Sequence, residues 1–402
     1  MQWTLPPFTL AQPLQFNALL LFGSLLLFGL IAGYIVSKSP WIPRITGYLL
    51  VGFVLGGGGL NLLTGDVLHV TSIFADIAVA LVVYQLGRYV DLGWLRRERW
   101  LLATVAVSAV LCFGFVSLAL LWFGTAQAPA LLGGIWAIAT APAVVLVVLR
   151  DLKAEGQVTR RLATMTALNN FVAILAAYAL LPWIAQESGT PLLTLLAHTL
   201  YSLFGSLLLA YLTYWLTMPL ARLLGRQRSR QFVLVIAVIT MAIGVAHALH
   251  LPVMLAMLMF AILSKNLDRQ YDLMELEFGV ANELFMVMLF VTVGASMRVS
   301  DLMLVGLPVL ILVAARFVAM GCGIFVFARL ARMNWRQAGL LTLGTLPMTE
   351  VGVGLMQTIS SLYPHTTAEV VPLLAGCLIV LELTGPVATQ FALINSGESG
   401  RE

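Results

Sequence analysis

Long apolar segments separated by short polar connectors dominate the chain. Each segment holds about 20 mostly apolar residues, the length that crosses a hydrocarbon core of ~30 Å as a helix. Turn and breaker residues such as Gly124 and Pro364 fall in the connectors. This pattern predicts an all-α polytopic membrane protein with about thirteen transmembrane spans, at 15–36, 45–60, 73–89, 101–123, 128–149, 162–185, 193–218, 231–247, 252–264, 279–296, 303–328, 337–361 and 368–394.

Composition and charge placement support this interpretation. The 402 residues are 60% hydrophobic and only 10% charged, whereas charged residues make up about 25% of soluble domains. With the N-terminus outside, all of the 22 basic residues except Arg298 and Arg316 lie in cytoplasmic connectors or the tail, as the positive-inside rule expects. The net charge of +4 therefore reports topology rather than a nucleic-acid partner.

The same distribution predicts an N-terminus outside and a cytoplasmic C-terminus. No Lys or Arg precedes Lys38, so the basic start of a secretory signal peptide is missing and we expect the first span to be retained. A bacterial inner membrane is the compartment that this pattern favours.

Two spans are interrupted at corresponding places. Pro142 lies in the fifth span and Pro347 in the twelfth. Spans one to six and eight to thirteen are offset by seven, so corresponding spans cross the membrane in opposite directions, as in transporters with inverted repeats. Proline frees backbone carbonyls, which are tolerated at membrane depth only when they are buried in protein or line a cavity. We therefore predict two broken helices around a buried polar site.

Charged residues inside spans are costly and indicate function. Arg316 lies near the middle of the eleventh span, where it needs an anion, a carboxylate or several carbonyls as partners. Glu350, beside the twelfth-span break, and Glu382, midway along the last span, are the candidate carboxylates. A buried ion pair that only braces the helices is the alternative interpretation of Arg316.

Asn169 and Asn170 lie in the sixth span. Adjacent residues on a helix point about 100° apart, so at most one is expected to face a given cavity squarely. Hydrogen bonding between helices is the alternative role for such amides. The histidines and the three cysteines lack metal-ligand spacing, and no nucleophile–base pair or cofactor motif appears. We therefore expect neither a metal, a cofactor nor an enzyme.

Several segments, taken in order, resemble the monovalent cation:proton antiporter superfamily, whose members share a sodium/hydrogen exchanger-like transmembrane domain. The resemblance covers nearly the whole chain and rests on Arg316 together with residues 84–99, 139–145, 290–296, 347–354 and 382–386. It implies a homodimer in a lipid bilayer, with a transmembrane domain at 1–394 and a short tail at 395–402.

The resemblance also implies a division of labour among the spans. Spans one to three and seven to ten would form a scaffold, and spans four to six and eleven to thirteen a core that moves like an elevator while it exchanges monovalent cations and protons. Thr140 and Ala141 would lie at the crossing of the broken helices, and Arg316 would neutralise the core.

One position departs from the family pattern. Members carry at least one Asp where this chain has Asn169 and Asn170, and an amide cannot take up a proton. Three readings remain open. Glu350 or Glu382 carries the proton and the protein exchanges Na⁺ or K⁺ for protons. Alternatively, Arg316 and the N-termini of half-helices attract an anion or neutral solute. In the third reading, the protein is a non-exchanging sensor or partner subunit.

Overall fold

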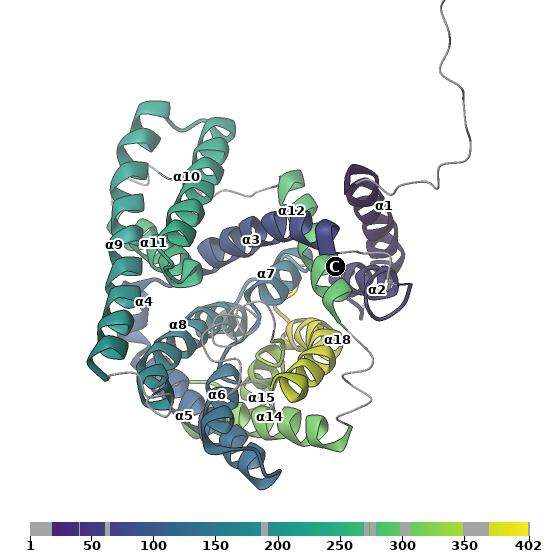
Figure 1. Cartoon of the computed structure of the whole chain (residues 1–402), viewed down its shortest axis with the longest axis vertical. Helices are drawn as coiled ribbons and strands as arrows, with labels where there is room; N and C mark the ends of the chain where they lie inside the picture. Colours follow the sequence, from purple (N-terminus) through teal and green to yellow (C-terminus); the bar gives the residue numbers. More distant parts are fainter. Residues whose placement is uncertain are drawn as a thin grey trace, which may run out of the picture.

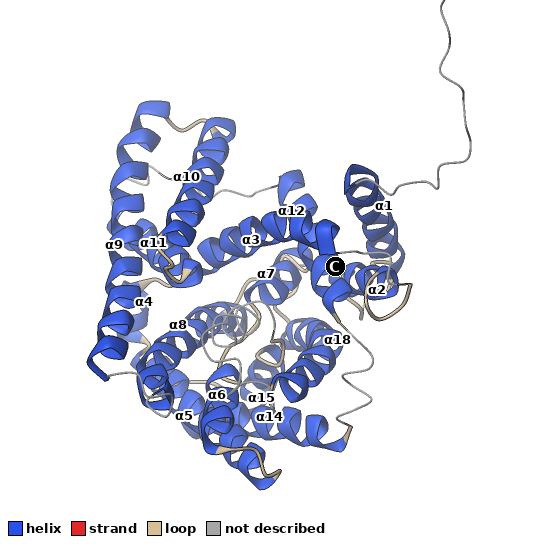
Figure 2. Ribbon diagram, in the orientation of Figure 1, coloured by secondary structure: helices blue, strands red, loops and turns tan. Residues whose placement is uncertain are grey.

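The computed structural model describes residues 18–39, 41–60, 65–185, 192–268, 273, 279–297, 306–348 and 370–400. In these ranges the chain forms helices joined by short connectors, without β-strands (Figure 2). The helices are α1 (Ala18–Val36), α2 (Arg44–Leu55), α3 (Gly65–Gly87), α4 (Leu92–Arg97), α5 (Arg99–Trp122), α6 (Gln127–Trp136), α7 (Pro142–Asp151), α8 (Gln157–Ala185), α9 (Leu192–Leu224), α10 (Arg228–Ala248), α11 (Val253–Leu267), α12 (Gly279–Ser296), α14 (Leu307–Phe327), α15 (Trp335–Gly344) and α18 (Val371–Ser396).

The all-helical membrane architecture predicted from the hydropathy pattern is confirmed. Six helices within the described ranges are long and apolar enough to cross a bilayer, namely α5, α10, α14, α18 and most of α8 and α9. Several shorter apolar helices, including α2 and α11, accompany them. Every predicted span overlaps a helix, although the number of membrane crossings stays a prediction.

Element boundaries differ from the predicted spans where polar residues occupy helix ends. Helix α3 begins at Gly65, not at residue 73, because hydropathy discounts its polar first turns. Helix α9 continues through Pro219 to Leu224, whereas the predicted span ended at residue 218. The short helix α4 lies in the basic connector and was not predicted. The Asp91 carboxylate caps it by accepting a hydrogen bond from the Trp94 amide at 3.0 Å, and this bond lowers the pKa of Asp91.

The helices form two groups that pack chiefly within themselves (Figure 1). Helices α5, α6, α8, α14, α15 and α18 make up one group, and α1, α2, α3 and α9 to α12 make up the other. Helix α7 packs against α3, α8 and α18 and thus contacts both groups. All residues of α7 from Pro142 to Leu149 are buried.

Two helices of the second group approach each other closely through glycine. A Cβ atom added to Gly52 of α2 would collide with the Val291 carbonyl of α12, and one added to Gly294 would collide with the Leu49 carbonyl of α2. The Gly57 amide also donates a hydrogen bond to the Ala295 carbonyl at 3.1 Å. Small residues allow such approaches between membrane helices, so α2 and α12 form a tight pair.

Candidate functional site

The predicted break in the fifth span is present. Helix α6 ends at Trp136 and α7 begins at Pro142, with a buried non-helical segment between them. Proline has no amide hydrogen to donate to the preceding turn, and its fixed φ suits the first position of a new helix. Thr140 and Ala141 lie in this segment and are almost completely buried.

The second break meets the first. Helix α15 ends at Gly344, and Pro347 follows in a non-helical stretch. The Ala141 amide donates a hydrogen bond of 3.0 Å to the Pro347 carbonyl, so the two interrupted segments are in direct backbone contact. Helix α18 fits against the same stretch, because a Cβ atom at Gly385 would lie 2.6 Å from the Pro347 Cα. Residues that are about two hundred positions apart in sequence thus build one crossing.

Arg316 of α14 ties both interrupted segments together. Its side chain is buried and donates hydrogen bonds to four backbone carbonyls: Ala137 at 2.9 Å, Ala139 at 2.8 Å, Leu346 at 2.8 Å and Thr345 at 3.4 Å. These carbonyls follow the C-terminal ends of α6 and α15, which carry partial negative charge. The guanidinium fork suits several acceptors at once.

Of the partners considered for Arg316, the structure shows several carbonyls. The hydrogen bonds that Arg316 makes within the described ranges all go to backbone carbonyls, and Glu350, one of the two candidate carboxylates, falls outside these ranges. Two helix ends, each with roughly half a negative charge, can compensate the arginine without a full anion. Backbone carbonyls have no sequence signature, which is why the sequence did not identify them.

Both asparagines of α8 contact Thr140. The Asn170 amide nitrogen donates to the Thr140 carbonyl at 2.7 Å and to the Thr166 carbonyl at 2.9 Å, and its oxygen accepts from the Thr140 amide at 3.3 Å. The Asn169 amide nitrogen donates to the Thr140 hydroxyl at 3.1 Å. The two adjacent amides can both contact this residue because Asn170 bonds to the Thr140 backbone and Asn169 to its side chain.

The two asparagines differ in how completely they are satisfied. Asn170 uses both ends of its amide, whereas the buried Asn169 oxygen accepts no hydrogen bond from any residue that the structure describes. A buried carbonyl oxygen without a donor costs about 1–3 kcal/mol and is suited to bind a cation or a donor group. Within the described residues, the Asn169 oxygen is therefore the polar atom of the crossing that can still accept a ligand.

Glu382 of α18 is the one fully buried acidic residue in the described part of the chain. It precedes, by about one helical turn, Gly385, which packs on Pro347. One turn further along, the Thr389 hydroxyl donates to the Gly344 carbonyl at the end of α15 at 3.3 Å. Glu382 thus lies on the helix that supports the second break. Glu350, the other predicted acid, falls outside the described residues.

Contacts that the sequence did not predict surround the site. The Cys112 thiol donates to the Ala137 carbonyl at 3.0 Å, which places this cysteine beside the first break rather than in a purely apolar core. Within the described ranges, no three His, Cys, Asp or Glu side chains gather as metal ligands would. Among the described residues, the arrangement offers amide, hydroxyl and carbonyl oxygens, with one buried carboxylate, that of Glu382, on the helix that packs against the second break.

Comparison with known proteins identifies the fold. Residues 23–394 match the family described as sodium/hydrogen exchanger, transmembrane. No curated protein sequence matches. Among solved structures, the sodium proton antiporter MjNhaP1 from Methanocaldococcus jannaschii is similar in two determinations.

The structure of MjNhaP1 at pH 8 is 16% identical, with a TM-score of 0.66 over 94% of this chain and 95% of that one. The structure from its electron microscopy map is 15% identical, with a TM-score of 0.73 over 96% and 97%. At these identities the likeness shows the fold alone, while the family match spans most of the sequence. The chain therefore belongs to the sodium/hydrogen exchanger family, whose members are membrane transporters rather than enzymes.

Proposed function

We propose that the protein exchanges a monovalent cation, Na⁺ or K⁺, for protons, with Glu382 as the group that takes up and releases the proton. The observation that carries the proposal is the burial of this carboxylate on the helix that packs against the broken-helix crossing. Exchange requires one group that is either protonated or ionised, and neither Asn169 nor Asn170 can supply it. Family membership and the fold of a sodium proton antiporter support the same activity.

The proposal includes the movement that the family resemblance implies. The helices around α5, α8, α14 and α18 form the core that moves, and the group around α2, α3 and α9 to α12 forms the scaffold of a homodimer in the inner membrane. The separate packing of the two helix groups supports this division. Because α7 carries the first break at its N-terminal end, it moves with the core.

A non-exchanging homologue is the second candidate, and one contact favours it. The Asn170 nitrogen donates to two carbonyls, and a protonated Asp would donate its single hydrogen to one of them. Asn170 therefore imitates an aspartic acid that never releases its proton. The anion reading has less support, since the hydrogen bonds of Arg316 are directed at carbonyls.

The test is proton flux in proteoliposomes that contain the unmodified protein, Glu382→Gln or Thr384→Val. Thr384 is exposed on the same helix, and in the described structure its hydroxyl donates a hydrogen bond only to the Val380 carbonyl, one turn earlier in that helix. We expect Glu382→Gln to lose cation-driven flux at least tenfold while Thr384→Val keeps it. Equal flux in Glu382→Gln and the unmodified protein, at equal reconstitution, would exclude Glu382 as the proton carrier.

A further inference from the structure

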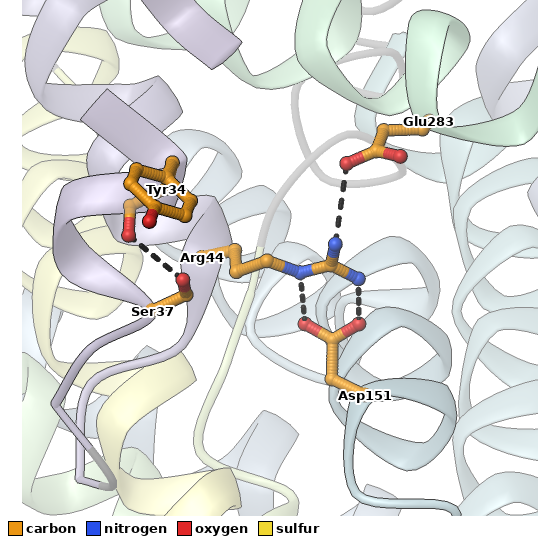
Figure 3. Close-up of polar contacts among 5 residues, drawn as sticks. All are labelled: Tyr34, Ser37, Arg44, Asp151 and Glu283. Carbon is orange, nitrogen blue, oxygen red and sulfur yellow. Dashed lines mark hydrogen bonds and ion pairs between the residues drawn. The ribbon is translucent and has the colours of Figure 1, made fainter. Parts of the chain in front are cut away.

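Three charged side chains from three different helices meet at one point away from the crossing (Figure 3). The Arg44 Nε donates to the Asp151 Oδ2 at 2.9 Å, and a second guanidinium nitrogen pairs with the Asp151 Oδ1. The remaining nitrogen, Nη1, lies 3.2 Å from the Glu283 Oε1. Asp151 is nearly buried, with 6% of its side chain exposed, whereas Arg44 and Glu283 are about one-third exposed or slightly more.

Helix dipoles show why the charges occur as a pair. Arg44 is the first residue of α2 and Asp151 the last residue of α7. A cation at a helix N-terminus and an anion at a helix C-terminus are each unfavourable by a few tenths to about 1 kcal/mol. Joined by a bidentate contact, each charge compensates the other and also faces the helix end that attracts it. Neither residue is explained by its own helix alone.

The triad joins the site-bearing segment to the tight helix pair. Asp151 ends α7, the half-helix that begins at Pro142 directly after Thr140 and Ala141. Arg44 and Glu283 belong to α2 and α12, the two helices in glycine-mediated contact. A helix of this length, about 15 Å, moves as a rigid rod, so a displacement of Asp151 is transmitted to Thr140.

We propose that Arg44, held by Glu283, is a positioning residue that fixes α7 against the α2–α12 pair, and that the Arg44–Asp151 contact opens when α7 moves during exchange. The second part rests on the proposed function. The contact is suited to such a role because it is partly exposed: water can solvate Arg44 when the pair separates. A fully buried pair would resist separation far more strongly.

The first measurement is independent of transport. Hydrogen–deuterium exchange of the α7 peptide is compared in the unmodified protein, Arg44→Gln, and the swapped pair Arg44→Asp with Asp151→Arg. Arg160→Gln is the control, because Arg160 forms a similarly spaced ion pair of 3.2 Å with Asp91 that does not involve α7. We expect exchange in α7 to rise about tenfold or more in Arg44→Gln, as a local opening becomes easier, and to return toward normal in the swapped pair.

The second measurement is flux in proteoliposomes. We expect Arg44→Gln to lower the maximal rate about tenfold with less than a twofold change in the half-saturating cation concentration, since the cation ligands are untouched. The swapped pair is expected to regain most of the rate. If the unmodified protein shows no flux, the proposed exchange fails while the positioning role is still decided by deuterium exchange.

The positioning role would be overturned if Arg44→Gln left deuterium exchange in α7 unchanged. It would also be overturned if deuterium exchange rose equally in all helices of this variant. A rise confined to α7 that the swapped pair does not reverse would also overturn it, because the effect would then not depend on the pairing of the charges. A changed half-saturating concentration at constant maximal rate would show that Arg44 acts on cation binding rather than on the position of α7.

Discussion

Single side chains decide what the crossing can do, and Asn170 is the clearest case. Its nitrogen donates to the carbonyls of Thr140 and Thr166, and its oxygen accepts from the Thr140 amide. A carboxylic acid at this position could donate to only one of these two carbonyls, because it carries one hydrogen where the amide nitrogen carries two, and an ionised carboxylate would face both carbonyl oxygens without any hydrogen between them. The amide is therefore the stable choice for a chain that does not titrate here.

Asn170→Asp is expected to make stability depend on pH. At low pH the protonated acid can still donate to one of the two carbonyls. As pH rises above the ordinary Asp pKa of about 4 and the acid ionises, the loss of that hydrogen bond costs about 1–3 kcal/mol, so the thermal unfolding temperature should fall as pH rises. Na⁺ or K⁺ should restore part of the loss by binding the carboxylate. Thermal unfolding in detergent, with choline as the inert cation, measures both effects.

Asn169→Asp provides the matched control. Its nitrogen bonds only to the Thr140 hydroxyl in the described structure, and that hydroxyl can rotate to donate to a carboxylate. We expect a smaller dependence on pH than in Asn170→Asp. An equal or larger dependence in Asn169→Asp would contradict the assignment of Asn170 as the position that imitates a protonated acid.

Arg316 supports a second prediction about a single residue. Arg316→Gln leaves several buried carbonyls without donors, and hydrogen bonds to a charged group contribute about 1.5–3 kcal/mol each. We expect a loss of stability of about 3 kcal/mol or more, with Arg316→Lys intermediate because an ammonium group lacks the planar fork. Chemical or thermal unfolding of the three proteins tests this order, and a lysine variant as stable as the arginine would contradict it.

At the scale of elements, the sequence predicted the helices better than their contacts. Pro142 and Pro347 marked both breaks, because proline lacks the amide hydrogen that continues a helix and its position can be read directly from the sequence. The partners of Arg316 could not be predicted, since they are carbonyls of Ala137, Ala139, Thr345 and Leu346. The contact of Arg44 with Asp151 and Glu283 was missed for another reason. The positive-inside rule already explained a basic residue at position 44, so nothing in the sequence pointed to an ion pair there.

The α2–α12 pair carries a prediction of its own. Gly294→Ala places a methyl group against the Leu49 carbonyl, which must force the helices apart at a cost of about 1–3 kcal/mol. Gly244→Ala in α10 meets nothing within 4 Å and is the control. We expect only Gly294→Ala to lower the thermal unfolding temperature. Equal behaviour of the two variants would show that the close approach of α2 and α12 is not required.

At the scale of the whole molecule, Glu398, just after the last helix, is hydrogen-bonded to the loop that follows α7 and to the start of α8. The Glu398 carboxylate accepts hydrogen bonds from the Val158 and Thr159 amides at 2.9 and 2.8 Å, and its carbonyl accepts from the Glu155 amide at 2.9 Å. The Val158 and Thr159 amides lie at the start of α8, where negative charge is favoured. The sequence predicted only a short tail, because capping across such a distance leaves no local pattern.

Glu398→Ala is therefore expected to destabilise the protein by about 1 kcal/mol, the usual value of a lost helix cap. The stability of Glu398→Gln should lie between those of the unmodified protein and Glu398→Ala, because glutamine keeps an acceptor oxygen but loses the charge. Thermal unfolding of the two variants against Glu155→Ala, whose exposed side chain has no hydrogen bond in the described structure, tests the order. A Glu398→Ala protein as stable as the control would show that the tail does not hold α8.

Hydropathy and proline positions predicted the architecture and the two breaks, the family resemblance predicted their crossing, and the chemistry at the crossing depends on the neutral amides of Asn169 and Asn170. The central claim is that the protein exchanges a cation for protons with the buried carboxylate of Glu382 as the proton carrier.

The most direct test is proton flux in pH-loaded proteoliposomes after addition of Na⁺ or K⁺, with protein-free vesicles as background and Asn170→Asp as a comparison. We expect cation-driven flux in the unmodified protein, well above background. Flux in Asn170→Asp alone, with the unmodified protein at background, would contradict this expectation and show that the antiporter fold is retained here without exchange.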